Sequence, residues 1–216
     1  MPAALVFAAA PLQPTPRLRA RLAGLISPTV IAADDGATTA LAFGFAPEIV
    51  LGDFDSLAPA TLGRLREQGA RIETFPRDKD ATDGQLAIER ALEEHPTELY
   101  LVGFLGGPRL DQELANVLLL TTIDVPSVML DDHNETRVLR PQTVLSWSAE
   151  PDEVVSLIPL TPTVDGVRTH GLRWPLSGDQ LRFGDTRGIS NEPVEPAVQV
   201  ETHGGLLLVT RHFPRL

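Results

Sequence analysis

The stretch IVLGDFDSL, residues 49–57, contains the pattern that determines the fold class. Its three leading apolar residues have the character of a buried strand, and Gly52 ends the run. Asp53 and Asp55 follow at once, with a single residue between them. In open parallel sheets, ligands bind at the carboxyl ends of the strands. We therefore expect both aspartates to lie at such an edge.

Similar apolar runs alternate with segments of helical periodicity over the first two thirds of the chain. We predict strands at 4–10, 29–36, 48–56, 71–76, 98–106 and 125–132. We predict helices at 15–26, 57–70, 80–95 and 110–123. This alternation is typical of a mainly parallel sheet covered by helices on both faces. Asp34, Asp53 and Asp131 would then all lie at the carboxyl ends of strands.

From about residue 142 the helical periodicity disappears. Short β-rich pieces follow, punctuated by glycine and proline in the manner of a sandwich or barrel. We expect two domains, an α/β domain over 1–144 and an all-β sandwich over 145–216. The expected fold class is therefore α/β, with the mainly parallel sheet first and the β-sandwich after it.

The composition excludes several classes of protein. Hydrophobic residues make up 43% and charged residues 22%, which are ordinary globular values. No apolar run approaches the ~20 residues of a membrane span. A net charge of −11 argues against nucleic-acid binding, although a divalent metal can still bridge acidic protein to a phosphate. The chain contains no cysteine, which excludes thiol chemistry and favours the cytoplasm.

The N-terminal stretch MPAALVFAAAPL resembles a signal peptide in its apolar centre and small residues. It lacks the basic n-region, because the first basic residue is Arg17. A buried first strand is the favoured interpretation.

Asp53 and Asp55 form an i, i+2 pair, which on an extended chain points both carboxylates to the same side. Two such charges repel unless a cation or a proton lies between them. Mg²⁺ fits this pair, because it prefers carboxylate oxygens and completes its shell with waters and substrate phosphates. The alternative is a solvated turn in which an aspartate caps the following helix.

The stretch RDKDATDG adds further charged groups. Lys79 is the only lysine among 18 basic residues, and it would contact a phosphate or balance the acids. Asp80 or Thr82 would cap the helix that follows. Asp83 lies in the first turn of that helix and would add a third carboxylate to the metal cluster.

The stretch GFLGGPRLDQELAN brings a glycine turn to the start of another predicted helix. Its two adjacent glycines allow the backbone to approach a ligand closely, and a helix N-terminus favours anions. Arg109 would bind a phosphate with two parallel hydrogen bonds, and Asp111 would be a helix cap or a metal ligand. No P-loop motif is present. Taken together, the three acidic loops predict magnesium-assisted phosphoryl chemistry.

The whole set of motifs resembles the thiamine pyrophosphokinase (thiamine diphosphokinase) family. The matching stretches occur in the family's order and cover nearly the whole chain: AADDGAT, PEIVLGDFDSL, KDATDGQLAIERAL, GFLGGPRLDQELANVLLL, LDDHNETRVL, VSLIPL, GLRWPL, GISNE and VETHGGLLLV. The combination of G-D-F-D-S with K-D-x-T-D is the most specific part.

The resemblance implies a transferase that moves pyrophosphate from ATP to the hydroxyl of thiamine, giving thiamine diphosphate and AMP, with Mg²⁺. It implies a homodimer whose site is shared between subunits. Metal and pyrophosphate ligands are implied at Asp53, Asp55 and Asp83, with Asp55 or Asp83 accepting the hydroxyl proton. Nucleotide and phosphate contacts are implied at Asp34, Thr82, Arg109 and Asp111, of which Asp111 joins the catalytic group. Thiamine contacts are implied at Trp174, Ser190 and Asn191, the tryptophan as an aromatic face for the cationic thiazolium.

Four positions depart from the family pattern. Pro108 is inserted before Arg109, and Gln112 stands where histidine is usual. Asp35 and Thr38 replace the usual glycine and asparagine. These changes concern the nucleotide pocket, so they bear on the identity of the nucleotide and of the acceptor more than on the fold.

Two alternatives remain open on the sequence. A haloacid-dehalogenase-like phosphatase also uses D-x-D, a distant lysine and a later D-D pair, here Asp131 and Asp132. Against it, Gly52 interrupts the strand before the first aspartate, and such a phosphatase has no use for the sandwich. The second alternative is a homologue that binds thiamine or a nucleotide without turnover.

Overall fold

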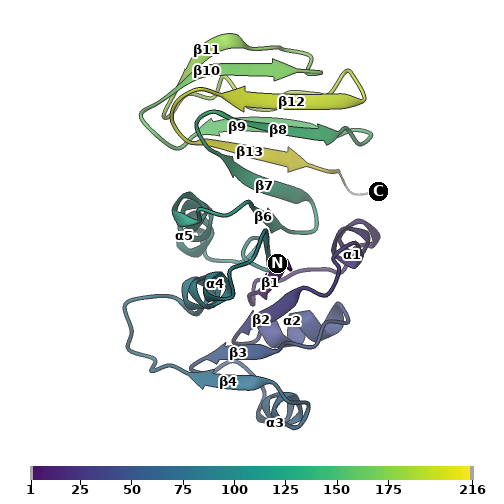
Figure 1. Cartoon of the computed structure of the whole chain (residues 1–216), viewed down its shortest axis with the longest axis vertical. Helices are drawn as coiled ribbons and strands as arrows, with labels where there is room; N and C mark the ends of the chain where they lie inside the picture. The colour runs from purple at the N-terminus through teal and green to yellow at the C-terminus, as the bar shows by residue number, and fades with distance from the viewer. Residues whose placement is uncertain (1, 215–216) are drawn as a thin grey trace. The chain divides into compact units, whose positions relative to one another are not determined.

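The computed structural model describes residues 2–214 and forms two compact units (Figure 1). The first unit ends at Asp132 and the second begins at His133. This division lies earlier in the chain than the boundary expected after residue 144. The reason is β7 (Asn134–Leu139), which pairs along its whole length with β13 (Leu207–His212) near the end of the chain.

The first unit alternates strands and helices. Its strands are β1 (Ala4–Phe7), β2 (Thr29–Ala33), β3 (Ile49–Gly52), β4 (Arg71–Thr74), β5 (Leu99–Val102) and β6 (Ser127–Leu130). Its helices are α1 (Pro16–Ala23), α2 (Gly36–Ala42), α3 (Pro59–Glu67), α4 (Asp83–Glu93), α5 (Leu110–Leu119) and the 3₁₀ turn η1 (Leu120–Thr122). Each predicted strand and helix of this region is present, but α2 was not predicted, because its seven residues are too few for a clear helical period.

The strands of the first unit lie in the order β4-β3-β2-β1-β5-β6, and all their pairings are parallel. The chain moves outward from β1 to β4 and then returns to place β5 on the other side of β1. The order therefore reverses between β1 and β5. In doubly wound sheets, such a switch point opens a crevice at the carboxyl ends of the strands, where ligands bind.

Helices cover both faces of this sheet, as the sequence predicted. Alternate strand residues such as Leu5, Phe7 and Val50 form one buried cluster with side chains of α1, α2 and the α3 region. The intervening strand residues face α4, which buries Ala87, Ile88 and Ala91. Figure 1 shows α4 on the opposite side of these strands from α1 and α2. Strands buried on both faces explain the continuous apolar runs in the sequence.

The second unit is antiparallel throughout. It contains β7, β13 and β9 (Val154–Pro159), in the order β7-β13-β9. A separate four-stranded sheet has the order β11-β10-β12-β8, from β8 (Thr143–Ser148), β10 (Thr163–His170), β11 (Ser177–Arg182) and β12 (Ala197–Thr202). One apolar cluster takes residues from both groups of strands, so they pack face to face as a β-sandwich.

No helix between residues 2 and 214 combines the length and the apolar character needed to cross a bilayer.

Candidate active site

A cavity of about 710 Å³ lies at the switch point of the first unit. It is lined by the segments that follow β1, β2, β3 and β5 and by the first turns of α4 and α5. Seven of the predicted site residues line it: Asp34, Asp53, Lys79, Thr82, Asp83, Arg109 and Asp111. The chain order thus carries three acidic loops into one crevice, as expected for a doubly wound sheet.

Asp34, Asp53 and Asp55 bring one carboxylate oxygen each to within 4.8 Å of one another. The premise that the D-x-D stretch is extended is wrong, because Phe54 adopts a left-handed conformation with φ 60°. The backbone N–H of Phe54 donates to Asp34 Oδ1 at 2.9 Å, and the N–H of Asp55 donates to Asp53 Oδ1 at 3.2 Å. These two hydrogen bonds hold the three carboxylates close to one another. Asp34 is also in the left-handed conformation, with φ 49°.

Gly52 makes room for a fourth acid. A Cβ placed on this residue would lie 2.7 Å from Asp34 Oδ1 and 3.3 Å from Asp83 Oδ1, so both carboxylates rest against the same glycine. Asp83 Oδ1 is buried and accepts no hydrogen bond from any residue between 2 and 214, although Lys79 Nζ lies 3.1 Å away. The distance between Lys79 Nζ and Asp83 Oδ1 is that of an ion pair, but the two groups are not oriented for a hydrogen bond. Asp83 Oδ1 therefore keeps a lone pair that a cation can use.

Burial raises the pKa of the Asp34 carboxyl above its ordinary value, and the charge of Asp83 adds the next largest effect. The hydrogen bond from Phe54 opposes this shift, while Asp53 and Asp55 add to it. The raised pKa of Asp34 thus has two causes, burial first and then the negative charge of the neighbouring carboxylates, which is a local excess of charge. Either a proton or a cation relieves such an excess.

The carboxylates at this point fit a divalent cation. The donors that approach one another are hard oxygens from Asp34, Asp53 and Asp55. Magnesium takes this kind of ligand and keeps open positions for waters and phosphates. This group differs from the expected set of Asp53, Asp55 and Asp83, because it includes Asp34, which the sequence assigned to the nucleotide. Asp83 lies against the same glycine and pairs with Lys79, so its role as a metal ligand stays a prediction.

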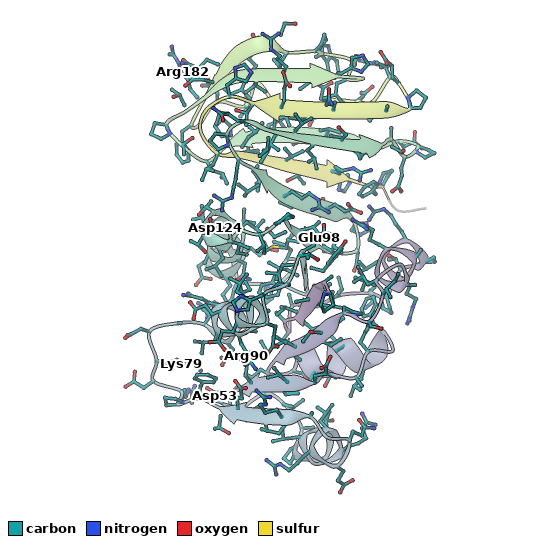
Figure 2. The ribbon with its side chains drawn as sticks, viewed as in Figure 1. Asp53, Lys79, Arg90, Glu98, Asp124 and Arg182 are labelled. Carbon is teal, nitrogen blue, oxygen red and sulfur yellow. The ribbon has the colours of Figure 1, made fainter. Side chains whose placement is uncertain are left out.

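Lys79 balances the acids, which was one of the two roles expected for it. Its Nζ lies 3.1 Å from Asp83 Oδ1 and 3.9 Å from Asp53 Oδ2, and it donates to the carbonyl of Pro76. Figure 2 shows Asp53 and Lys79 close together beside β3 and β4. Thr82 caps α4, because its hydroxyl accepts from the N–H of Gln85 at 3.1 Å.

Arg109 and Asp111 bind each other at the start of α5. Arg109 Nε donates to Asp111 Oδ1 at 3.1 Å, and its Nη2 contacts the second oxygen. This pair lowers the pKa of the Asp111 carboxyl. Both side chains are exposed, and Asp111 lies within the first turn rather than at the N-cap position, which Arg109 occupies.

Several residues of the cavity wall were not predicted from the sequence. Arg77 adds a third cation beside Lys79 and Arg109. Phe104, Glu113 and Asn116 shape the loop between β5 and α5. Glu113 is a first-turn acid of the kind that any helix favours, so its residue type gave no signal of a further role.

Two of the four positions that depart from the family pattern line the cavity, and two do not. Pro108 and Gln112 line the cavity. Thr38 donates to Asp35 at 2.6 Å at the start of α2, and neither residue is among the lining residues. Asp131 and Asp132, the later pair of the phosphatase alternative, do not line the cavity, and Asp132 accepts from the N–H of Gln13 at 2.8 Å.

The three residues implied for thiamine lie together in the second unit. Asn191 is buried and binds both polar groups of the Trp174 backbone, accepting at 3.1 Å and donating at 2.8 Å. Trp174 is 55% exposed, and Arg173 lies over its ring at 5.7 Å. Ser190 precedes Asn191 in a left-handed conformation, and its N–H donates to Ser156 Oγ. Asn191 thus fixes the loop that presents the indole.

These features define an α/β protein with an acidic, cation-fitting site at a topological switch point, joined to a β-sandwich. The family model described as thiamin pyrophosphokinase, catalytic domain, matches residues 26–130. The model described as thiamin pyrophosphokinase, vitamin B1 binding domain, matches residues 142–207. The chain belongs to the thiamin pyrophosphokinase family.

Individual relatives agree with this assignment. The thiamine pyrophosphokinase of Bacillus subtilis (strain 168) is 28% identical over 184 residues, which cover 84% of this chain and 86% of that protein. The crystal structure of thiamine pyrophosphokinase from Bacillus subtilis matches the fold with a TM-score of 0.87, at 24% identity over 99% of this chain and 100% of the other. The thiamin pyrophosphokinase structure from Geobacillus thermodenitrificans gives a TM-score of 0.83, at 28% identity over 98% of each chain.

Proposed function

We propose that this chain transfers a pyrophosphoryl group from ATP to the hydroxyl of thiamine, giving thiamine diphosphate and AMP. The observation that carries the proposal is the carboxylate group of Asp34, Asp53 and Asp55, beside a cavity that Asp83, a glycine loop and three cations also line. The family supports ATP as co-substrate and thiamine as acceptor.

In this reaction the hydroxyl oxygen of thiamine forms a bond to the β-phosphorus of ATP. The bond from that phosphorus to the oxygen bridging to the α-phosphate breaks, and AMP leaves with the electron pair. Asp55 or Asp83 accepts the hydroxyl proton, since a carboxylate close to the attacking oxygen can act as a general base. Lys79 and Arg77 provide positive charge in the cavity wall near the transferring group.

Mg²⁺, held by Asp34, Asp53, Asp55 and Asp83, would neutralise charge on the phosphate oxygens. Asp111 holds the Arg109 guanidinium at the start of α5, where Arg109 exchanges this partner for a phosphate. Thr82 keeps the first turn of α4 in place and with it Asp83. Trp174 offers its exposed face to the cationic thiazolium, and Ser190 and Asn191 shape that loop.

The test is an assay for AMP with purified protein, ATP, thiamine and MgCl₂, with thiamine omitted as a control. Thiamine-dependent AMP is the expected product. Asp53→Asn should abolish it, whereas Asp80→Asn should not, because Asp80 is exposed and lies outside the cavity lining. Orthophosphate without AMP would favour the phosphatase alternative, and tight thiamine binding without AMP would favour a non-catalytic homologue.

Two further expectations accompany the proposal. The homodimer with a site shared between subunits is tested by sedimentation, where a monomer at assay concentration would contradict it. The cytoplasmic location is tested by fractionating cells that produce the protein.

A further inference from the structure

The loop between β5 and α5, residues 103–109, is held at two points by side chains of α5. Asn116 Nδ2 donates to the carbonyl oxygen of Phe104 at 2.8 Å. The carboxylate of Glu113 accepts a hydrogen bond from the backbone N–H of Gly106. Glu113 and Asn116 are three residues apart on α5, so they lie on the same side of the helix. Together they fasten one side of the loop to the helix that follows it.

The loop needs such fastening because of its glycines. Gly103 and Gly106 have φ angles of 77° and 85°, which favour glycine. A Cβ on Gly103 would lie 2.3 Å from the carbonyl oxygen of Ala8, so the loop must also pass close to the end of β1. Glycine residues have many accessible conformations, and each hydrogen bond from a fixed helix removes some of them.

Phe104 extends this arrangement to the carboxylate cluster. A Cβ on Gly84 would lie 3.0 Å from Cε1 of Phe104, so the ring rests directly on the first turn of α4. Gly84 follows Asp83, whose carboxylate reaches Lys79 and the Gly52 region. By holding the Phe104 carbonyl, Asn116 therefore fixes a ring that packs beside the acidic part of the cavity.

We propose that Glu113 and Asn116 are positioning residues for nucleotide binding, acting through Gly106 and Phe104. They hold the loop in the shape that receives the phosphates of the nucleotide. The inference rests on the proposed function, because it takes a nucleotide as the ligand of this cavity. Ordinary helix capping does not account for the contacts, since both side chains reach out of the helix to the loop.

Paired substitutions separate positioning from charge and from general stability. Glu113→Ala removes the acceptor for Gly106, whereas Glu113→Gln keeps an acceptor oxygen and removes only the charge. Asn116→Asp keeps the shape but cannot donate to Phe104. Glu67→Ala is the control, because Glu67 is an exposed residue at the end of α3 and lies outside the cavity lining.

The experiment measures KM for ATP and kcat from thiamine-dependent AMP release, the Kd for AMP by calorimetry, and the melting temperature. Glu113→Ala and Asn116→Asp should raise KM and Kd about tenfold with kcat within about twofold, as expected for lost positioning of a binding loop. Glu113→Gln should stay within about threefold of the wild type, and Glu67→Ala should equal it.

Wild-type KM and Kd in Glu113→Ala, or equal losses in Glu113→Ala and Glu113→Gln, would overturn the inference. If Asn116→Asp does not fold, the two Glu113 variants decide. A wild-type chain without thiamine-dependent AMP release refutes the proposed function, and the AMP titrations of the same variants then decide the inference alone. A wild-type chain that neither releases nor binds AMP overturns both.

Discussion

Replacing Gly52 by alanine tests the geometry of the site most directly. The new Cβ would lie 2.7 Å from Asp34 Oδ1 and 3.0 Å from its Cγ, which is closer than such atoms approach. The carboxylate of Asp34 must therefore move, and it then loses the hydrogen bond from Phe54, now 2.9 Å long. Asp83, at 3.3 Å from the same Cβ, is pushed as well.

The expected loss of stability has two parts. The backbone at φ 149° costs roughly 1–3 kcal/mol for a residue with a side chain. Loss of a hydrogen bond to a charged group costs roughly 1.5–3 kcal/mol. We expect the free energy of unfolding to fall by about 3–5 kcal/mol in total. AMP release should fall about 100-fold, because misplacing reacting groups by about 1 Å has effects of that size.

Gly63→Ala is the matched control. Gly63 lies inside α3, and a Cβ there would meet nothing within 4 Å. The same substitution should therefore raise the free energy of unfolding by up to about 1 kcal/mol and leave AMP release unchanged. Urea denaturation and the AMP assay are run on both variants. The reasoning is refuted if Gly52→Ala keeps activity within about twofold and stability within about 1 kcal/mol of the wild type.

Three further outcomes follow from the contacts. Asp55→Asn should abolish AMP release and leave the melting curve intact, because this acid is exposed; full activity would remove it from the metal site. With EDTA present, the raised pKa of Asp34 means that the folded state binds its proton more tightly than the unfolded chain does. The contribution of Asp34 to the free energy of unfolding is therefore complete below pH 3.8 and declines as the pH rises through its raised pKa. Melting curves recorded over this pH range should show the decline in the wild type but not in Asp34→Asn. In the second unit, Arg211→Ala leaves the fully buried Glu153 without its cation, so it should lower the free energy of unfolding by about 3–5 kcal/mol. Arg168 is exposed, so Arg168→Ala should lower it by less than about 1 kcal/mol. Urea denaturation measures both. Equal costs for the two arginines would contradict this account.

The sequence allowed prediction of the parts of the site that depend on local pattern. The acids that follow apolar runs lie at strand ends, since parallel strands bring their carboxyl ends to one edge. Thr82 could be placed as a helix cap for a similarly local reason, because its hydroxyl serves an N–H three residues on. The mainly parallel sheet followed by a sandwich was also predicted, and both are present.

Other parts could not be predicted, because they depend on contacts between distant segments. Phenylalanine rarely adopts left-handed backbone, so the conformation of Phe54 could not be predicted from its residue type. Here its N–H is bonded to Asp34, 20 positions earlier in the chain. Arg109 was expected to bind a phosphate, but its pairing with Asp111 was not predicted. Glu113 looked like an ordinary first-turn acid, because only the folded loop brings Gly106 to it.

The strain and the charge of the site occur at the same few residues. Asp34, Gly52 and Phe54 all have positive φ, and the carboxylates beside them repel one another. The strained backbone and the repulsion between carboxylates both cost free energy, and they persist only because the surrounding structure fixes the conformation. The surroundings here are β2 and β3, which are buried along almost their whole length between two layers of helices. We therefore expect Asp34→Asn to stabilise the metal-free chain while it abolishes AMP release, so that in this variant stability and activity change in opposite directions.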